Sequence, residues 1–179
     1  MSPEAPAPES LSPGRSAAGG RRLRMAVGLG LAFAILVVDR LVKEALVARF
    51  VERGEPWPVE ITSFFNLVMV WNRGISFGLF QGDETGRWIL VALAAAISLL
   101  LVVWLARAAG MLAAVALGLV LGGAVGNAWD RFQWGAVADF FDVHAFGYHF
   151  WAFNVADMGI SVGVGLLLLD GLFARGPEA

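Results

Sequence analysis

Long stretches of predominantly apolar residues dominate this 179-residue chain, and they limit what it can fold into. Each is long enough to cross a hydrocarbon core of about 30 Å as an α-helix. Hydrophobic residues make up 58% of the chain, above the roughly 45–50% that is usual in soluble domains. The sequence therefore predicts a membrane protein, mainly α-helical, with one domain over 25–170. Its four transmembrane helices are expected at 25–48, 88–106, 108–129 and 150–169.

The segments between and beyond these spans differ in composition. Residues 1–24 are rich in Pro, Ser, Ala, Gly and Arg and are expected to be a disordered tail, because they cannot bury enough apolar surface. A second short tail follows at 171–179. In the region over 50–87, residues 60–80 are rich in β-branched and aromatic side chains, which predicts short strands in a small sheet. A loop is expected over 130–149.

The arrangement of basic residues suggests an orientation in the membrane. Arg21, Arg22 and Arg24 precede a short apolar core, as in a cleavable signal peptide. No small-x-small cleavage site follows, so the segment is interpreted as an uncleaved first span. The positive-inside rule then favours cytoplasmic termini, because the first helix usually sets orientation. The region over 50–87 would accordingly be extracytoplasmic, although the total count of basic residues on the two sides does not decide the matter.

Polar side chains concentrate in and between the last two apolar runs. An ionisable side chain at the centre of a transmembrane helix costs roughly 2.5–3.5 kcal/mol on insertion scales. Leu or Val would pack there without that cost, so such a cluster is first interpreted as a functional site. Its members are Asn127, Asp130, Arg131, Asp139, Asp142, Asn154 and Asp157.

Asp139 and Asp157 are the candidate catalytic residues. Two neighbouring carboxyl groups cannot both ionise cheaply, so one holds a proton while the other acts as a base. Such a pair can activate water and protonate a leaving amine, which is peptide hydrolysis without a metal. The residues alone also allow a structural interpretation, in which each carboxylate is a buried group satisfied by an Arg or a backbone amide.

Other polar residues have similar pairs of interpretations. Asn154 lies three residues before Asp157, on the same helical face, where it could orient the carboxylate, bind substrate or bond to another helix. Asn127 precedes Asp130 and Arg131 on a second polar face, for which a stabilising Asp–Arg bond is the favoured interpretation.

Two further groups lie nearer the ends of the predicted spans. Asp39 and Lys43 have the spacing of an ion pair on one helical face. Asn72 and Gly74 in the sequence WNRG suit either a turn that aims an amide at the site or a plain surface turn.

Several classes of chemistry are not expected. The chain has no cysteine, which excludes disulfides and thiolate chemistry. His144 and His149 do not have the spacing of a standard metal cluster, so no metal and no cofactor are predicted. There is no nucleophile-elbow serine, P-loop or dinucleotide fingerprint. A net charge of −2 without a basic patch gives no reason to expect nucleic-acid binding.

The ordered motifs resemble those of the bacterial lipoprotein signal peptidases, the signal peptidase II family, over roughly residues 30–170. An Asp-x-x-x-Lys motif stands as DRLVK (Asp39 to Lys43), and an Asn-x-Gly motif stands in WNRG (Asn72 to Gly74). The remaining motifs are GNAWDR (Gly126 to Arg131), VADF with Asp139, and FNVAD with Asn154 and Asp157. Met158 and Val42 stand where the family usually has smaller or hydroxylated residues, which bears on substrate preference.

The resemblance implies a four-helix membrane aspartic peptidase in the bacterial inner membrane, with its site near the extracytoplasmic face. Its substrates would be diacylglyceryl-modified prolipoproteins, cleaved just before the lipidated cysteine, and globomycin would inhibit it. Asp139 and Asp157 correspond to the family's catalytic pair. The residues implied to line or support the site are Asn72, Gly74, Asn127, Arg131 and Asn154.

Two alternatives from other classes use the same carboxylates. A small proton-coupled transporter would also keep carboxylates within the membrane, but the chain has no inverted repeat. A membrane scaffold would need the carboxylates only as structural partners. Neither alternative accounts for the ordered set of motifs.

Overall fold

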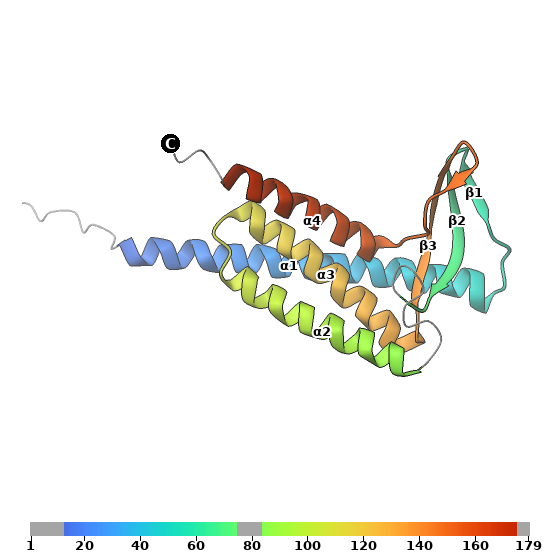
Figure 1. Ribbon diagram of the computed structural model, residues 1–179, viewed down its shortest axis with the longest axis horizontal. Helices are drawn as coiled ribbons and strands as arrows, with labels where there is room; N and C mark the ends of the chain where they lie inside the picture. The colour runs from blue at the N-terminus through green and yellow to red at the C-terminus, as the bar shows by residue number, and fades with distance from the viewer. Residues whose placement is uncertain (1–12, 75–83, 175–179) are drawn as a thin grey trace, which may run out of the picture.

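The computed structural model describes residues 13–74 and 84–174 as a helical bundle with a small sheet at one end (Figure 1). The start of α1 and the end of α4 lie at the opposite end of the bundle from the sheet. The helices are α1 (Pro13–Val47), which continues into a π-helical turn η1 (Ala48–Glu52), α2 (Glu84–Ala106), α3 (Met111–Trp134) and α4 (Val155–Ala174). The strands are β1 (Val59–Thr62), β2 (Phe65–Asn72), β3 (Val137–Ala145) and β4 (Tyr148–His149).

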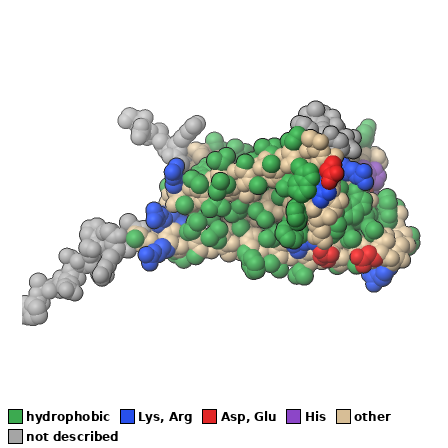
Figure 2. Space-filling model, turned by 90° about the horizontal axis from the view of Figure 1, so that it is seen from below, with side chains coloured by type: hydrophobic (Ala, Val, Ile, Leu, Met, Phe, Trp, Pro, Cys, Tyr) green, Lys and Arg blue, Asp and Glu red, His purple; other side chains and the backbone are tan. Residues whose placement is uncertain are grey.

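Four helices in the described part of the chain are long and apolar enough to cross a membrane. Hydrophobic side chains cover the side of the bundle seen in Figure 2. Basic side chains gather at the end where α1 begins, and charged side chains of both signs gather at the sheet end. This distribution suits a bundle surrounded by lipid with polar groups at its two ends. The predicted fold class, a mainly α-helical membrane protein with a small sheet, is confirmed.

Helix α3 lies at the centre of the bundle, where its glycines let neighbouring backbones approach closely. A Cβ at Gly118 would lie 2.3 Å from the carbonyl oxygen of Gly28 in α1, and one at Gly123 would lie 2.2 Å from that of Ala156 in α4. Small residues permit such contacts between membrane helices, whose association depends on van der Waals packing. The close approach of α3 and α4 brings Asn127 near Asp157.

The sheet is antiparallel in the order β1-β2-β3-β4. Strands β1 and β2 fall in the region predicted to form strands. The predicted loop over 130–149 is wrong, because it contains β3 and β4. The sequence of β3, VADFFDVHA, has the β-branched and aromatic residues of a strand. It pairs with β2, far away in sequence, and Val70 lies opposite Asp139.

Several helix boundaries differ from the prediction, most of all the start of α1, the end of α3 and both ends of α4. Helix α3 continues to Trp134, into the segment predicted as a loop. Helix α1 begins at Pro13, so residues 13–24 are helical rather than part of a disordered tail. Proline is compatible with the first helical turn, and the Ala and Arg residues that follow favour a helix. Helix α4 occupies Val155–Ala174 rather than 150–169, because residues 150–154 are extended and bond to β3. The rest of the predicted tails and of the predicted strand region lies at 1–12, 75–83 and 175–179, outside the described residues.

Candidate active site

Strand β3 and the start of α4 form one side of the candidate site. The amides of Phe140 and Phe141 donate to the carbonyl oxygen of Phe153 at 3.1 and 2.9 Å, and Phe153 donates back to Phe141 at 3.1 Å. These backbone bonds fix the segment before α4 against the strand. They place Asn154 beside Asp139, which the sequence could not show because the two residues belong to different elements.

The first turn of α4 holds Asp157 through a reciprocal cap. The backbone amide of Asp157 donates to Asn154 Oδ1 at 2.9 Å, and the amide of Asn154 donates to Asp157 Oδ2 at 3.2 Å. This is the bonding pattern of a capping box, with Asn and Asp in place of the usual Ser or Thr and Glu. The cap explains why α4 begins at Val155, and it fixes the Asp157 carboxyl at the positive end of the helix dipole.

Neutral amide groups surround both candidate catalytic carboxyl groups. Asn154 Nδ2 donates to Asp139 Oδ1 at 2.6 Å, and Asn72 Nδ2 donates to Asp139 Oδ2 at 3.2 Å. Asn127 Nδ2 donates to Asp157 Oδ1 at 2.7 Å. Asn154 therefore contacts both aspartates, and no cationic side chain among the described residues bonds to either carboxyl group.

The surroundings of Asp139 favour its protonated form. Its side chain is buried, with 3% of the residue exposed. Burial, together with the smaller effect of the charge of Asp157, raises the pKa of Asp139 to about 7, although the hydrogen bonds from Asn72 and Asn154 oppose that rise. Burial disfavours the charged form of a carboxyl group, and a neighbouring carboxylate acts in the same direction. Near neutral pH this group can therefore either hold or release a proton.

Arg131 and Gly74 organise the edge of the site near β2. Arg131 donates through Nη2 to the carbonyl oxygen of Gly74 at 3.2 Å and through Nη1 to that of Asn127 at 3.3 Å. The amide of Gly74 donates to Asn72 Oδ1 at 3.3 Å. Arg131 thus fixes the turn that carries Asn72. This favours the interpretation in which the turn directs the Asn72 amide at the site over that of a plain surface turn.

A second group of buried charges lies behind the candidate site. Lys43 Nζ lies 2.8 Å from Asp39 Oδ2 and 2.7 Å from Asp130 Oδ2, and all three side chains are fully buried. Asp130 also pairs with Arg40 at 2.9 Å, so its partners are Lys43 and Arg40 rather than the expected Arg131. Asp39 accepts the amide of Ala156 at 2.9 Å, which ties α1 to the first turn of α4.

Sequence reasoning missed Arg40 as a partner and left the histidines without a role. Arg40 follows Asp39 directly in the sequence. The Asp-x-x-x-Lys motif pairs Asp39 with Lys43 and gives Arg40 no partner. In the sheet, His149 Nδ1 lies 2.8 Å from Asp142 Oδ2, and the ring of His149 stacks on that of His144. The described residues contain no group of His, Asp and Glu side chains that could hold a metal ion.

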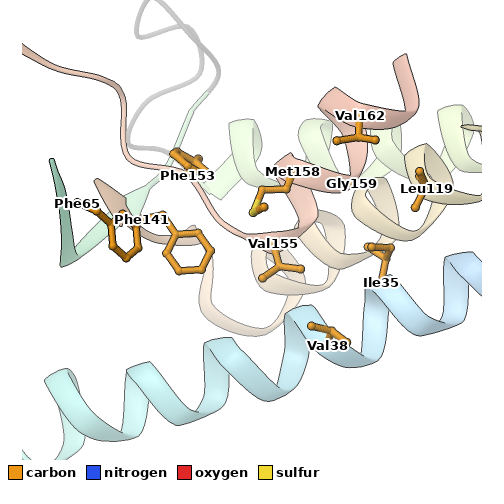
Figure 3. Close-up of a pocket in the computed structure, with 10 residues that line it drawn as sticks. All are labelled: Ile35, Val38, Phe65, Leu119, Phe141, Phe153, Val155, Met158, Gly159 and Val162. Atoms are coloured by element: carbon orange, nitrogen blue, oxygen red, sulfur yellow. The ribbon is translucent and has the colours of Figure 1, made fainter. Parts of the chain in front are cut away.

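An apolar groove lies on another face of α4 (Figure 3). It has a volume of about 580 Å³, and its lining residues from α4 include Val155 and Met158, next to the residues of the cap. Its other lining residues are Ile35, Val38, Phe65, Leu119, Phe141, Phe153, Gly159 and Val162. The groove can accommodate hydrocarbon, but it offers no side chain that can move a proton.

The fold and the buried polar groups define a multi-pass membrane protein with a paired-carboxyl site. Residues 31–173 match the family described as signal peptidase (SPase) II. The chain is 46% identical to the lipoprotein signal peptidase of Methylobacterium sp. (strain 4-46), over 86% of this chain and 94% of the relative. It is 45% identical to that of Nitrobacter hamburgensis, over 85% and 94%.

A solved structure shares the fold of this chain. It is titled as a bacterial membrane enzyme structure by the in meso method at 2.3 Å resolution. It superposes with a TM-score of 0.71 at 25% identity, over 85% of this chain and 91% of that one. The chain belongs to the signal peptidase II family and is a peptidase. The transporter alternative finds no support in these similarities.

Proposed function

We propose that this protein is an aspartic endopeptidase that removes signal peptides from diacylglyceryl-modified prolipoproteins, with Asp139 and Asp157 as its catalytic pair. The observation that carries the proposal is that both carboxyl groups bond to Asn154 and are otherwise surrounded by amides. Because no cation bonds to either group in the described part of the chain, neither is neutralised. The pair is therefore available for proton transfer.

The two aspartates differ in a way that assigns their roles. Asp139, with its raised pKa, holds the proton and donates it to the carbonyl oxygen of the scissile bond. Asp157 takes a proton from water, and the water oxygen forms the new bond to the carbonyl carbon. When the carbon–nitrogen bond breaks, the leaving nitrogen takes the proton held by Asp157. The collapsing hydroxyl group returns a proton to Asp139, which restores both groups.

The position of the site suits a substrate that is anchored in lipid. Asp157 lies in the first turn of α4, and Asp139 lies in the sheet at the same end of the bundle. A scissile bond at the membrane surface can bind beside Asp139 and Asp157 while the acyl chains of the substrate stay in the hydrocarbon. We infer that this end faces away from the cytoplasm and that both termini are cytoplasmic, in the bacterial inner membrane. Globomycin is expected to inhibit the reaction.

Cleavage of a diacylglyceryl-modified prolipoprotein by purified protein tests the proposal. Asp139→Asn and Asp157→Asn should each lower kcat by roughly 10²–10⁴-fold, the range attributed to general acid–base catalysis. Both variants should keep the wild-type unfolding temperature in detergent. Asp142→Asn is the matched control, because Asp142 is also a buried aspartate of β3 but bonds to neither candidate catalytic residue. Near-normal cleavage by either dyad variant would reject the proposed pair.

A further inference from the structure

Lys43 makes one contact in addition to its two buried ion pairs with Asp39 and Asp130. Its fully buried ammonium group has three hydrogens to donate. Asp39 and Asp130 lie within 2.8 Å and would by themselves balance its charge. The remaining contact is to Asn127 Oδ1 at 3.2 Å. Asn127 is the residue whose amide nitrogen donates to Asp157 at 2.7 Å.

This contact determines which way round the Asn127 amide lies. The two ends of an asparagine amide have nearly the same shape, and hydrogen-bond partners decide which end is which. An ammonium group can only donate, so the atom facing Lys43 must be the oxygen of Asn127. The NH₂ group is then directed at Asp157, where it can donate to a carboxylate.

Among the described residues, no other side chain supplies this constraint as well. Asn154 Nδ2 also approaches Asn127 Oδ1, at 3.3 Å. However, the two hydrogens of that nitrogen already face Asp139 Oδ1 at 2.6 Å and the carbonyl oxygen of Ala138 at 3.3 Å. Three acceptors therefore compete for two hydrogens on Asn154. Lys43 has three hydrogens, so its ion pairs with Asp39 and Asp130 leave one for the bond to Asn127.

We propose that Lys43 is a positioning residue for the peptidase reaction, holding the Asn127 amide so that its NH₂ group faces Asp157. The inference rests on the proposed function, because it concerns the geometry of the proposed base. Without Lys43 the amide can turn and present its oxygen to Asp157, which then loses the donor that fixes it. Lys43 itself touches neither substrate nor reacting atoms.

The test must remove the ammonium group without leaving an unbalanced buried charge. Lys43→Met combined with Asp39→Asn removes one charge of each sign and leaves the ion pair between Arg40 and Asp130. The asparagine keeps an oxygen that can accept the amide of Ala156. Loss of the directed hydrogen bond should lower kcat by roughly 10- to 100-fold, with KM within about twofold. Asp39→Asn alone, the matched control, keeps the contact from Lys43 to Asn127, so its kcat should fall less than that of the double variant.

A double-mutant cycle separates positioning from a general structural effect. In an Asn127→Ala background there is no amide to orient. The Lys43→Met/Asp39→Asn pair should then cause no further loss of kcat, measured in single turnovers with enzyme in excess. An independent structural effect would instead multiply the two losses. Lys43→Leu/Asp39→Asn serves the same comparison if the first double variant does not fold.

The possible outcomes test the positioning role of Lys43 and the proposed function separately. Non-multiplicative losses in the cycle support the positioning role. Wild-type cleavage with losses that multiply, or with a raised KM and an unchanged kcat, would overturn that role and leave the proposed function standing. Absence of cleavage by the wild type would overturn the proposed function, and with it the inference that depends on it.

Discussion

Two pairs of aspartates lie at the same end of this bundle, and their surroundings differ. Asp39 and Asp130 flank the ammonium group of Lys43, at 2.8 and 2.7 Å. Asp139 and Asp157 have only amide groups as hydrogen-bond donors among the described residues. A cation beside a buried carboxylate balances its charge, whereas the amides around Asp139 and Asp157 supply hydrogen bonds but no counter-charge. The same residue type therefore has a cationic partner in one pair and amide partners in the other.

The two pairs are connected rather than separate. Asn127 accepts from Lys43 and donates to Asp157, and Asp39 bonds to the amide of Ala156, next to Asp157 in sequence. The ion pairs thus fix the backbone and the amides that surround the candidate catalytic groups. Groups that act in catalysis need precise geometry, and the charged cluster supplies such geometry without bonding to the candidate catalytic carboxyl groups.

The largest expected effect on stability comes from breaking the charged cluster. Asp130→Ala removes the carboxylate that accepts from Lys43, from Arg40 and from the amide of Ala138. Removing one member of a buried ion pair typically costs about 3–5 kcal/mol. The free energy of unfolding in mild detergent should fall by that amount.

Asp139→Asn provides the contrast with Asp130→Ala. It should abolish cleavage while changing the free energy of unfolding much less, because an asparagine keeps an acceptor for Asn154. Equal losses of stability in the two variants would break the distinction between a structural pair and a catalytic pair.

The fold is largely predictable because it depends on features that are local in sequence. Length and apolarity alone place the four spans. The apolar residues at 150–153 move the predicted start of α4 to 150, although the N-cap pattern of Asn154 with Asp157 marks the true boundary. Strand β3 is not predicted because its partner, β2, is far away in the chain. The β-branched and aromatic residues of β3 are compatible with a strand, but only the pairing with β2 shows that one forms.

The site is predictable in its residues but not in its bonds. The cost of placing Asp157 and Asn127 at membrane depth already marks them as candidates for a functional site. Nothing in the sequence shows that Asp130 turns toward Lys43 and Arg40 rather than Arg131. That choice depends on the packing of α1 against α3, which the close contact between Gly28 and Gly118 sets.

The pH dependence of stability should show a more gradual effect, smaller over any one pH unit. The folded-state pKa of Asp139 is raised to about 7, against about 3.9 for an unperturbed aspartate. Between these values the folded protein binds a proton that the unfolded chain does not. Stability therefore falls as pH rises from about 4 to about 7, by at most about 1.4 kcal/mol per pH unit from this group. Unfolding in detergent at several pH values should show a shallower slope for Asp139→Asn than for the wild type.

The smallest effect is expected at Asp142, an aspartate that belongs to neither pair. It is buried in the same strand as Asp139, but its partners are His149, whose side chain is 58% exposed, and Asn66. Ion pairs with an exposed partner contribute about 0–1 kcal/mol, and an amide in place of the carboxyl group would keep an oxygen to accept from Asn66. Asp142→Asn should therefore change the free energy of unfolding by less than about 1 kcal/mol and leave kcat for prolipoprotein cleavage within about twofold. If kcat instead fell as far as in Asp139→Asn, burial of a carboxyl group in β3 would be enough to make it essential. The amide surroundings of Asp139 and Asp157 would then no longer distinguish the catalytic pair.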